Sequence, residues 1–126
     1  MQAALLVMAG GALGALGRFM LGRALFALTG PGWPWGTFAA NVAGGFLMGL
    51  LVGWLARHGG ADQANWRLFL GVGLLGGFTT FSSYTLEIAL MVERGAWMAG
   101  LAYALLSAAV ALVALFAGLG LTRAVG

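Results

Sequence analysis

The sequence contains no cysteine and no lysine, and charged residues occupy only 7% of its 126 positions. Without cysteine, disulfide scaffolds and thiol catalysis are excluded. A soluble domain usually has about a quarter of its residues charged, so this chain cannot cover itself in water. Hydrophobic residues instead make up 62% of the chain. The composition therefore predicts an integral membrane protein with almost no domain outside the bilayer.

Several common functions lack their residues here. The six arginines are scattered and form no basic run, so nucleic acid is not an expected partner. The single histidine, His58, cannot build a metal-ligand cluster, and no credible set of serine, histidine and acid is present. The pattern GxGxxG occurs at residues 71–76, but it lies inside an apolar run with no preceding strand. We therefore expect no enzyme.

Four apolar runs are long enough to cross a bilayer, at residues 2–28, 36–55, 66–92 and 96–121. Turn formers and the interfacial residues Trp33 and Trp35 separate the first two runs, and residues 57–63 form the one clearly polar loop. The first run lacks a basic leader and a convincing cleavage site, which indicates a retained helix and not a signal peptide. We predict an all-α membrane protein with a single transmembrane domain, residues 1–126.

The arginines are balanced between the two predicted sides of the membrane. Arg57, Arg67 and Arg123 lie on one side, and Arg18, Arg23 and Arg94 lie toward the other. Such balance gives almost no orientation bias, which favours insertion both ways up. If Arg18 and Arg23 lie too deep to count, a single orientation results. Glycines four residues apart, such as Gly10 and Gly14, predict close helix packing within or between subunits, and four thin helices favour a homo-oligomer.

The third run contains an unusual segment. Gly76 and Gly77 are followed closely by Thr79 and Thr80, a combination that disfavours a continuous helix. Broken membrane helices make ion sites, because free carbonyls bind cations and half-helix N-termini favour anions. The alternative is an unbroken helix in which the two glycines form a packing notch.

Polar and aromatic residues follow the two glycines of this segment. Thr79, Ser83 and Glu87 are four residues apart and are predicted to share one helical stripe, and Phe81 and Tyr84 are neighbouring aromatics. Hydroxyl donors and positive ring edges can hold an anion without a full counter-charge. The alternative is core packing, with hydroxyls bonded back to their own helix.

Three more polar residues lie within predicted spans. The lone amide Asn41 can donate to a passing anion, or it can form an interhelical hydrogen bond instead. Tyr103 and Ser107 are four residues apart and either extend a polar lining or pack in the core.

The motifs that contain these residues resemble the Fluc (CrcB) fluoride channels. They are GGALGALGR at residues 10–18, GTFAANVAG at 36–44 and GGFTTFSS at 76–83, and the resemblance covers essentially the whole chain. It implies a passive fluoride channel in the cell (inner) membrane, with a broken third helix. It also implies an antiparallel, dual-topology homodimer with two pores. A structural Na⁺ at the dimer centre would be held by backbone carbonyls of Gly76 and Thr79 from each subunit.

The resemblance further implies roles for single residues. The family's pore asparagine corresponds to Asn41 and its first pore phenylalanine to Phe81, whereas the second falls on Tyr84, a departure that adds a hydroxyl. Polar pore positions match Thr37, Ser82, Ser83, Thr85, Glu87, Tyr103 and Ser107, while a further one is Ala111 here. Arg18 matches the vestibule arginine.

Two other functions remain open. A small proton-coupled exporter needs a titrating carboxylate in the membrane, and Glu87 is the only acidic residue well inside a predicted span. A non-transporting accessory subunit is the second alternative.

Overall fold

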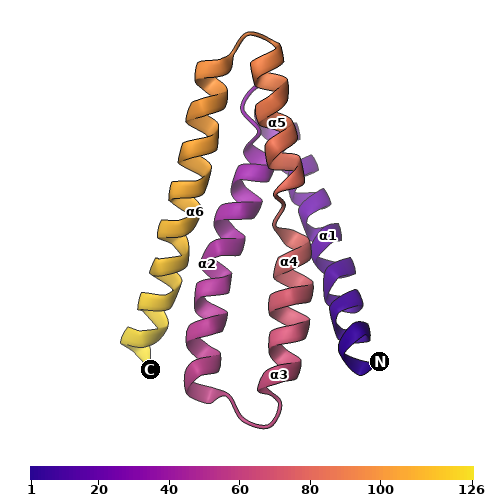
Figure 1. Ribbon diagram of the computed structural model, residues 1–126, viewed down its shortest axis with the longest axis vertical. Coiled ribbons are helices and arrows are strands. Elements are labelled where there is room, and N and C mark those ends of the chain that lie inside the picture. Colours follow the sequence, from indigo (N-terminus) through magenta and orange to yellow (C-terminus); the bar gives the residue numbers. More distant parts are fainter.

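The computed structural model describes residues 1–126 and consists of helices without strands (Figure 1). Three long helices, α1 (Gln2–Thr29), α2 (Trp35–His58) and α6 (Trp97–Val125), account for most of the chain. Each is long and apolar enough to cross a membrane. The chain is therefore an all-helical membrane protein, as the composition predicts.

The third apolar run is built from several short elements. α3 (Gln63–Trp66), η1 (Arg67–Leu75) and α4 (Gly76–Phe78) follow one another directly, and η1 is a π-helix, which is wound more widely than an α-helix. Thr79 then has an extended backbone with ψ at 159°, and α5 (Ser82–Glu93) begins after it. Residues 79–81, here called the 79–81 linker, separate the two helical parts (Figure 1).

Glycines allow the chain to reverse at two of its turns. Gly30, which caps α1, has a φ of 71°, and its N–H donates to the carbonyl of Phe26 at 2.7 Å. Gly95, between α5 and α6, has a φ of 83°. Side chains rarely adopt this left-handed backbone region, whereas glycine enters it without strain.

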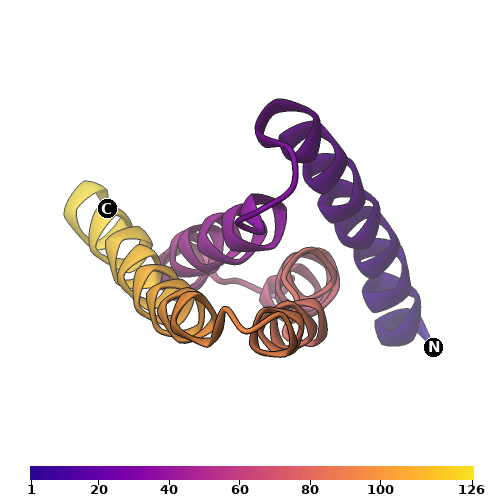
Figure 2. The ribbon, with the colours of Figure 1, turned by 90° about the horizontal axis from the view of Figure 1, so that it is seen from above.

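Close glycine contacts join the long helices in pairs. α2 packs along α6, where a Cβ on Gly49 would collide with the carbonyl oxygen of Leu115. α1 packs along η1 and α4, where a Cβ on Gly10 would collide with the carbonyl oxygen of Phe69. These contacts confirm the predicted close packing, here within one chain, and Figure 2 shows α1 and α6 on opposite sides of the molecule.

Few side chains are buried by contacts within this single chain. Only 15 of the 126 residues are buried, so most large apolar side chains are left to face lipid or another protein.

Candidate functional site

Asn41 on α2 holds the backbone of the 79–81 linker. Its side-chain Nδ2 donates to the carbonyl of Thr80 at 3.0 Å, and the Thr80 N–H donates to its Oδ1 at 2.8 Å. The interhelical alternative for this amide is thus realised. The pair of bonds also gives the non-helical backbone the partners that it needs in an apolar surrounding.

Two carbonyls at the linker lack the N–H donors that a continuous helix would give them. In a continuous helix the N–H of Thr80 would donate to Gly76 and that of Ser83 to Thr79. Here Thr80 donates to Asn41, and Ser83 donates to the Oγ1 of Thr80 at 3.2 Å. The carbonyl oxygens of Gly76 and Thr79 therefore remain available as hard oxygen ligands, the kind that cations prefer.

Thr79 corrects one sequence prediction. The stripe of Thr79, Ser83 and Glu87 assumes one continuous helix, but Thr79 lies before α5 begins. Its hydroxyl donates back to the carbonyl of Leu75 at 2.9 Å. Only Ser83 and Glu87 share α5.

An inner cavity of about 310 Å³ lies beside the linker. Its walls come from α2, the linker, α5 and α6 and include the predicted residues Asn41, Phe81, Tyr84 and Ser107. Ser107 is 3% exposed, and its Oγ has no hydrogen-bond partner. A buried hydroxyl without a partner costs free energy, so this oxygen is a candidate ligand-binding atom.

The two aromatic residues of this cavity differ in their surroundings. Phe81 is 76% exposed in the single chain, and its ring centroid lies 5.6 Å from that of Tyr84. The Tyr84 hydroxyl donates to the carbonyl of Ala104 on α6 at 2.6 Å. The extra hydroxyl at this position is therefore satisfied by the protein and leaves the ring beside the cavity.

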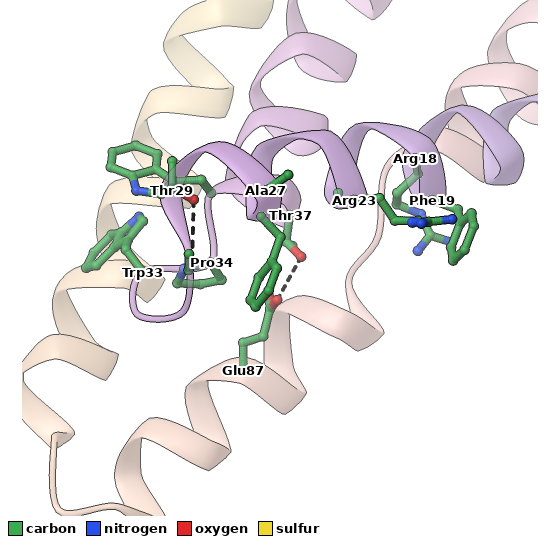
Figure 3. Close-up of a pocket in the computed structure, with 14 residues that line it drawn as sticks. Arg18, Phe19, Arg23, Ala27, Thr29, Trp33, Pro34, Thr37 and Glu87 are labelled. Atoms are coloured by element: carbon green, nitrogen blue, oxygen red, sulfur yellow. Dashed lines mark hydrogen bonds between the residues drawn. The ribbon is translucent and has the colours of Figure 1, made fainter.

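An outer cavity of about 600 Å³ lies between α1, the α1–α2 loop, the start of α2 and α5 (Figure 3). Arg18, Arg23, Trp33, Thr37 and Glu87 are among the residues that line it. The Nε of Arg18 donates to the carbonyl of Gly77 at 3.3 Å, close to the linker. Two guanidinium groups against one carboxylate give the cavity a positive excess, which attracts anions.

Glu87 joins three helices at the base of the outer cavity. Its Oε2 accepts a hydrogen bond from Thr37 on α2, and its Oε1 accepts one from Tyr103 on α6, both at 2.9 Å. Figure 3 shows the bond to Thr37. Tyr103 itself is fully buried. The carboxylate is therefore engaged on both oxygens by hydroxyl donors.

Four predicted pore residues line neither of these two cavities. They are the buried Tyr103 on α6 and, at the start of α5, Ser82, Ser83 and Thr85. Thr85 donates to the carbonyl of Ser82 at 3.0 Å, which matches the local-bonding alternative. Their role in a pore stays a prediction.

Trp33 is a cavity residue that the sequence motifs do not predict. It lines the outer cavity and packs edge-to-face on Tyr103, with ring centroids 5.2 Å apart. Its place among turn formers suggested only an interfacial anchor, and no local pattern links it to a residue on the last helix.

Comparison with known proteins shows which family the chain is similar to. The family model described as CrcB-like protein, Camphor Resistance (CrcB), matches residues 5–119. A protein of Phenylobacterium zucineum (strain HLK1) named Fluoride-specific ion channel FluC is 64% identical over 125 residues, which covers 99% of this chain and 98% of that protein. Proteins of the same name from Caulobacter vibrioides (strain NA1000 / CB15N) and Novosphingobium aromaticivorans are 51% and 50% identical, with 98% and 99% of their own lengths covered. The match spans nearly the whole chain and confirms the resemblance seen in its motifs: this protein belongs to the CrcB-like family.

Proposed function

We propose that this protein is a passive fluoride-selective channel of the cell (inner) membrane and not an enzyme. The observation that carries the proposal is the inner cavity, where Asn41, Phe81, Tyr84 and Ser107 meet beside the 79–81 linker. Relatives that carry the name of a fluoride-specific channel match this chain almost from end to end.

The chemistry of the inner cavity suits a small, strongly hydrated anion. Fluoride gives up its water only where close donors replace it. The Ser107 hydroxyl is free to donate. The Asn41 amide has two N–H groups, and one of them binds Thr80, which leaves the other for an ion. The ring edges of Phe81 and Tyr84 add a diffuse positive potential.

A structural Na⁺ fits the donor set at the linker. The freed carbonyls of Gly76 and Thr79 supply two oxygen ligands from one chain, and a second chain would supply two more. When bound, the ion would add a fixed positive charge near the path of an anion. The chain's own residues keep the linker non-helical. Asn41 accepts from the Thr80 N–H and the Thr80 hydroxyl accepts from the Ser83 N–H, so neither N–H bonds to these carbonyls.

The assembly is proposed as an antiparallel homodimer with two pores. The column of η1, α4 and α5 would provide the fourth span beside α1, α2 and α6. The Phe81 ring, largely exposed in one chain, gains cover only from lipid or a second subunit. Balanced arginines on the two sides would allow both orientations that such a dimer needs.

The outer cavity would serve as a vestibule that collects fluoride by its positive charge, with Arg18 at its inner end. Conduction is passive, and an inside-negative potential favours anion exit by about 2.3 kcal/mol per charge per 100 mV. The role would be relief of fluoride toxicity. The contacts of Glu87 argue against a proton-coupled exporter, because both of its oxygens are engaged by hydroxyls.

Fluoride efflux from liposomes tests the proposal. The purified protein is reconstituted, a K⁺ diffusion potential is imposed, and fluoride efflux is compared with chloride efflux in the same vesicles. We expect fast fluoride efflux without a proton gradient and little chloride efflux. Efflux that requires a proton gradient would instead support the exporter, and a silent assay would support an accessory subunit.

A further inference from the structure

Aromatic rings form an unbroken series between the two cavities. The Trp33 ring meets Tyr103 edge-to-face, with centroids 5.2 Å apart and planes at 87°. The Tyr103 ring lies 5.6 Å from Tyr84, which in turn lies 5.6 Å from Phe81. Trp33 lines the outer cavity, whereas Tyr84 and Phe81 line the inner one. Tyr103 itself lines neither cavity, and its buried ring lies between the ring that lines the outer cavity and the rings that line the inner one.

Tyr103 is fully buried, and the Trp33 ring is the part of its cover that faces the outer cavity. The Tyr103 hydroxyl donates to Glu87 at 2.9 Å, and this bond fixes only the end of the ring. On the side of the outer cavity, the ring is held by Trp33. Because about 600 Å³ of open space lies beyond, removal of the indole would let the phenol swing outward and leave Glu87.

The α1–α2 loop and the first turn of α2 thus hold the Glu87 site from two positions. Trp33 packs on the tyrosine that binds one carboxylate oxygen, and Thr37 binds the other oxygen directly. We propose that Trp33 is a positioning residue, which keeps the Tyr103 hydroxyl on Glu87 and the Tyr103 ring between the two cavities. Its effect on fluoride flux rests on the proposed channel function, whereas its effect on Tyr103 does not.

Fluorine NMR with 3-fluorotyrosine tests the positioning directly, because the chain has only two tyrosines. Two signals are expected in the assembled protein, and the one lost in Tyr103→Phe belongs to Tyr103. Trp33→Leu should shift the Tyr103 signal strongly, since it removes the ring current of the indole and frees the phenol. An unmoved Tyr103 signal would overturn the proposal.

Trp35→Leu is the matched control for this spectrum. Trp35 is the first residue of α2, two positions after Trp33, and contacts Trp33 and Phe38. None of the ring contacts of Tyr103 involves Trp35, so its removal should leave the Tyr103 signal near its original place. A shift as large as that of Trp33→Leu would mean that the whole loop moves, and would overturn a specific role for Trp33.

Fluoride efflux then tests the functional consequence. Trp33→Leu should lower efflux about two- to tenfold, Trp33→Phe should recover most of it, and Trp97→Leu, an exposed tryptophan at the start of α6, should leave it unchanged. In a Tyr103→Phe background, Trp33→Leu should cause a smaller further loss than in the unsubstituted protein, because the hydroxyl that it positions is already gone and only the ring remains to be held. Additive losses would overturn the proposal.

Two further outcomes are informative. If Trp33→Leu does not assemble, a proton–fluorine NOE between the Trp33 indole and fluorotyrosine 103 in the otherwise unchanged protein supports the contact, and its absence overturns it. If the unsubstituted protein carries no fluoride, the channel proposal fails, whereas the NMR result still decides the position of Tyr103.

Discussion

The substitution Asn41→Ala removes both hydrogen bonds that hold the 79–81 linker against α2. The Thr80 N–H loses its acceptor at 2.8 Å, and the Thr80 carbonyl loses its donor at 3.0 Å. No water from the bilayer core can replace them. The Thr80 N–H would then be free to bond the Gly76 carbonyl, which would extend the helix through the linker and remove one proposed Na⁺ ligand.

The size of the effect follows from the number of bonds. Interhelical hydrogen bonds in membranes average about 0.6 kcal/mol and reach about 1.7 kcal/mol, so the pair contributes about 1–3 kcal/mol. This amount corresponds to a preference for the clamped linker of about five- to 150-fold. The same substitution also removes the amide N–H that is proposed to face fluoride. We therefore expect both a less stable assembly and a fluoride efflux reduced by about tenfold or more.

The measurement pairs efflux with thermal unfolding of the assembled protein. Asn65→Ala makes the same chemical change in α3, away from both cavities, and should alter neither quantity. Asn41→Asp keeps an acceptor for the Thr80 N–H but adds a negative charge to the inner cavity. Its second oxygen would face the Thr80 carbonyl that Asn41 now donates to, and an unpaired carboxylate in the membrane is costly, so we expect it to be no more stable than Asn41→Ala and to conduct no better. Wild-type efflux and wild-type stability in Asn41→Ala would refute both roles of this residue.

Four further outcomes are expected. Ser107→Ala should leave thermal stability unchanged or higher, because its buried Oγ has no partner, while fluoride efflux falls several-fold; unchanged efflux removes Ser107 from the pore. Glu87→Gln should reduce efflux, because an amide nitrogen cannot accept one of the two hydroxyl bonds. The remaining efflux should stay independent of a proton gradient. If Glu87→Gln abolishes transport, and transport by the unsubstituted protein requires a proton gradient, the exporter is favoured instead. Replacement of Na⁺ by a large organic cation should slow efflux and lower thermal stability if the carbonyls of Gly76 and Thr79 hold the ion, and no change would count against that site. Lysines added to the loop at residues 59–63 should impose one orientation and impair dimer assembly, whereas normal dimers with one confirmed orientation would contradict dual topology.

Several features of the fold are readable from the chain itself. The scarcity of charge and the long apolar runs predict membrane helices, because a side chain's preference for lipid or water depends on its own chemistry. α1, α2 and α6 accordingly begin and end within a few residues of the predicted spans. The motif that contains Asn41 and the one that contains Phe81 predict the family, since each is continuous in sequence.

Periodicity failed where the helix is interrupted. The predicted stripe assigns Thr79 to the face of Ser83 and Glu87 by counting four residues, and this count holds only along one continuous helix. Because the backbone of Thr79 is extended, the four-residue count does not place Thr79 on the same helix face as Ser83. Glycine and threonine propensities indicate a weak helix, but they do not say at which residue it ends.

Composition and local pattern by themselves determined that this chain lies in a membrane as helices. They also determined that an amide, hydroxyls and aromatic rings are the few polar or polarisable groups within its spans. Only the tertiary structure decided what each of them does. Asn41 is 39 residues from Thr80 and Thr37 is 50 residues from Glu87, and Trp33 in the α1–α2 loop contacts Tyr103 on α6. Such contacts arise because close glycine packing brings separate helices together. The orientation of one helix against another depends on both surfaces at once, so the sequence of a single helix does not predict it.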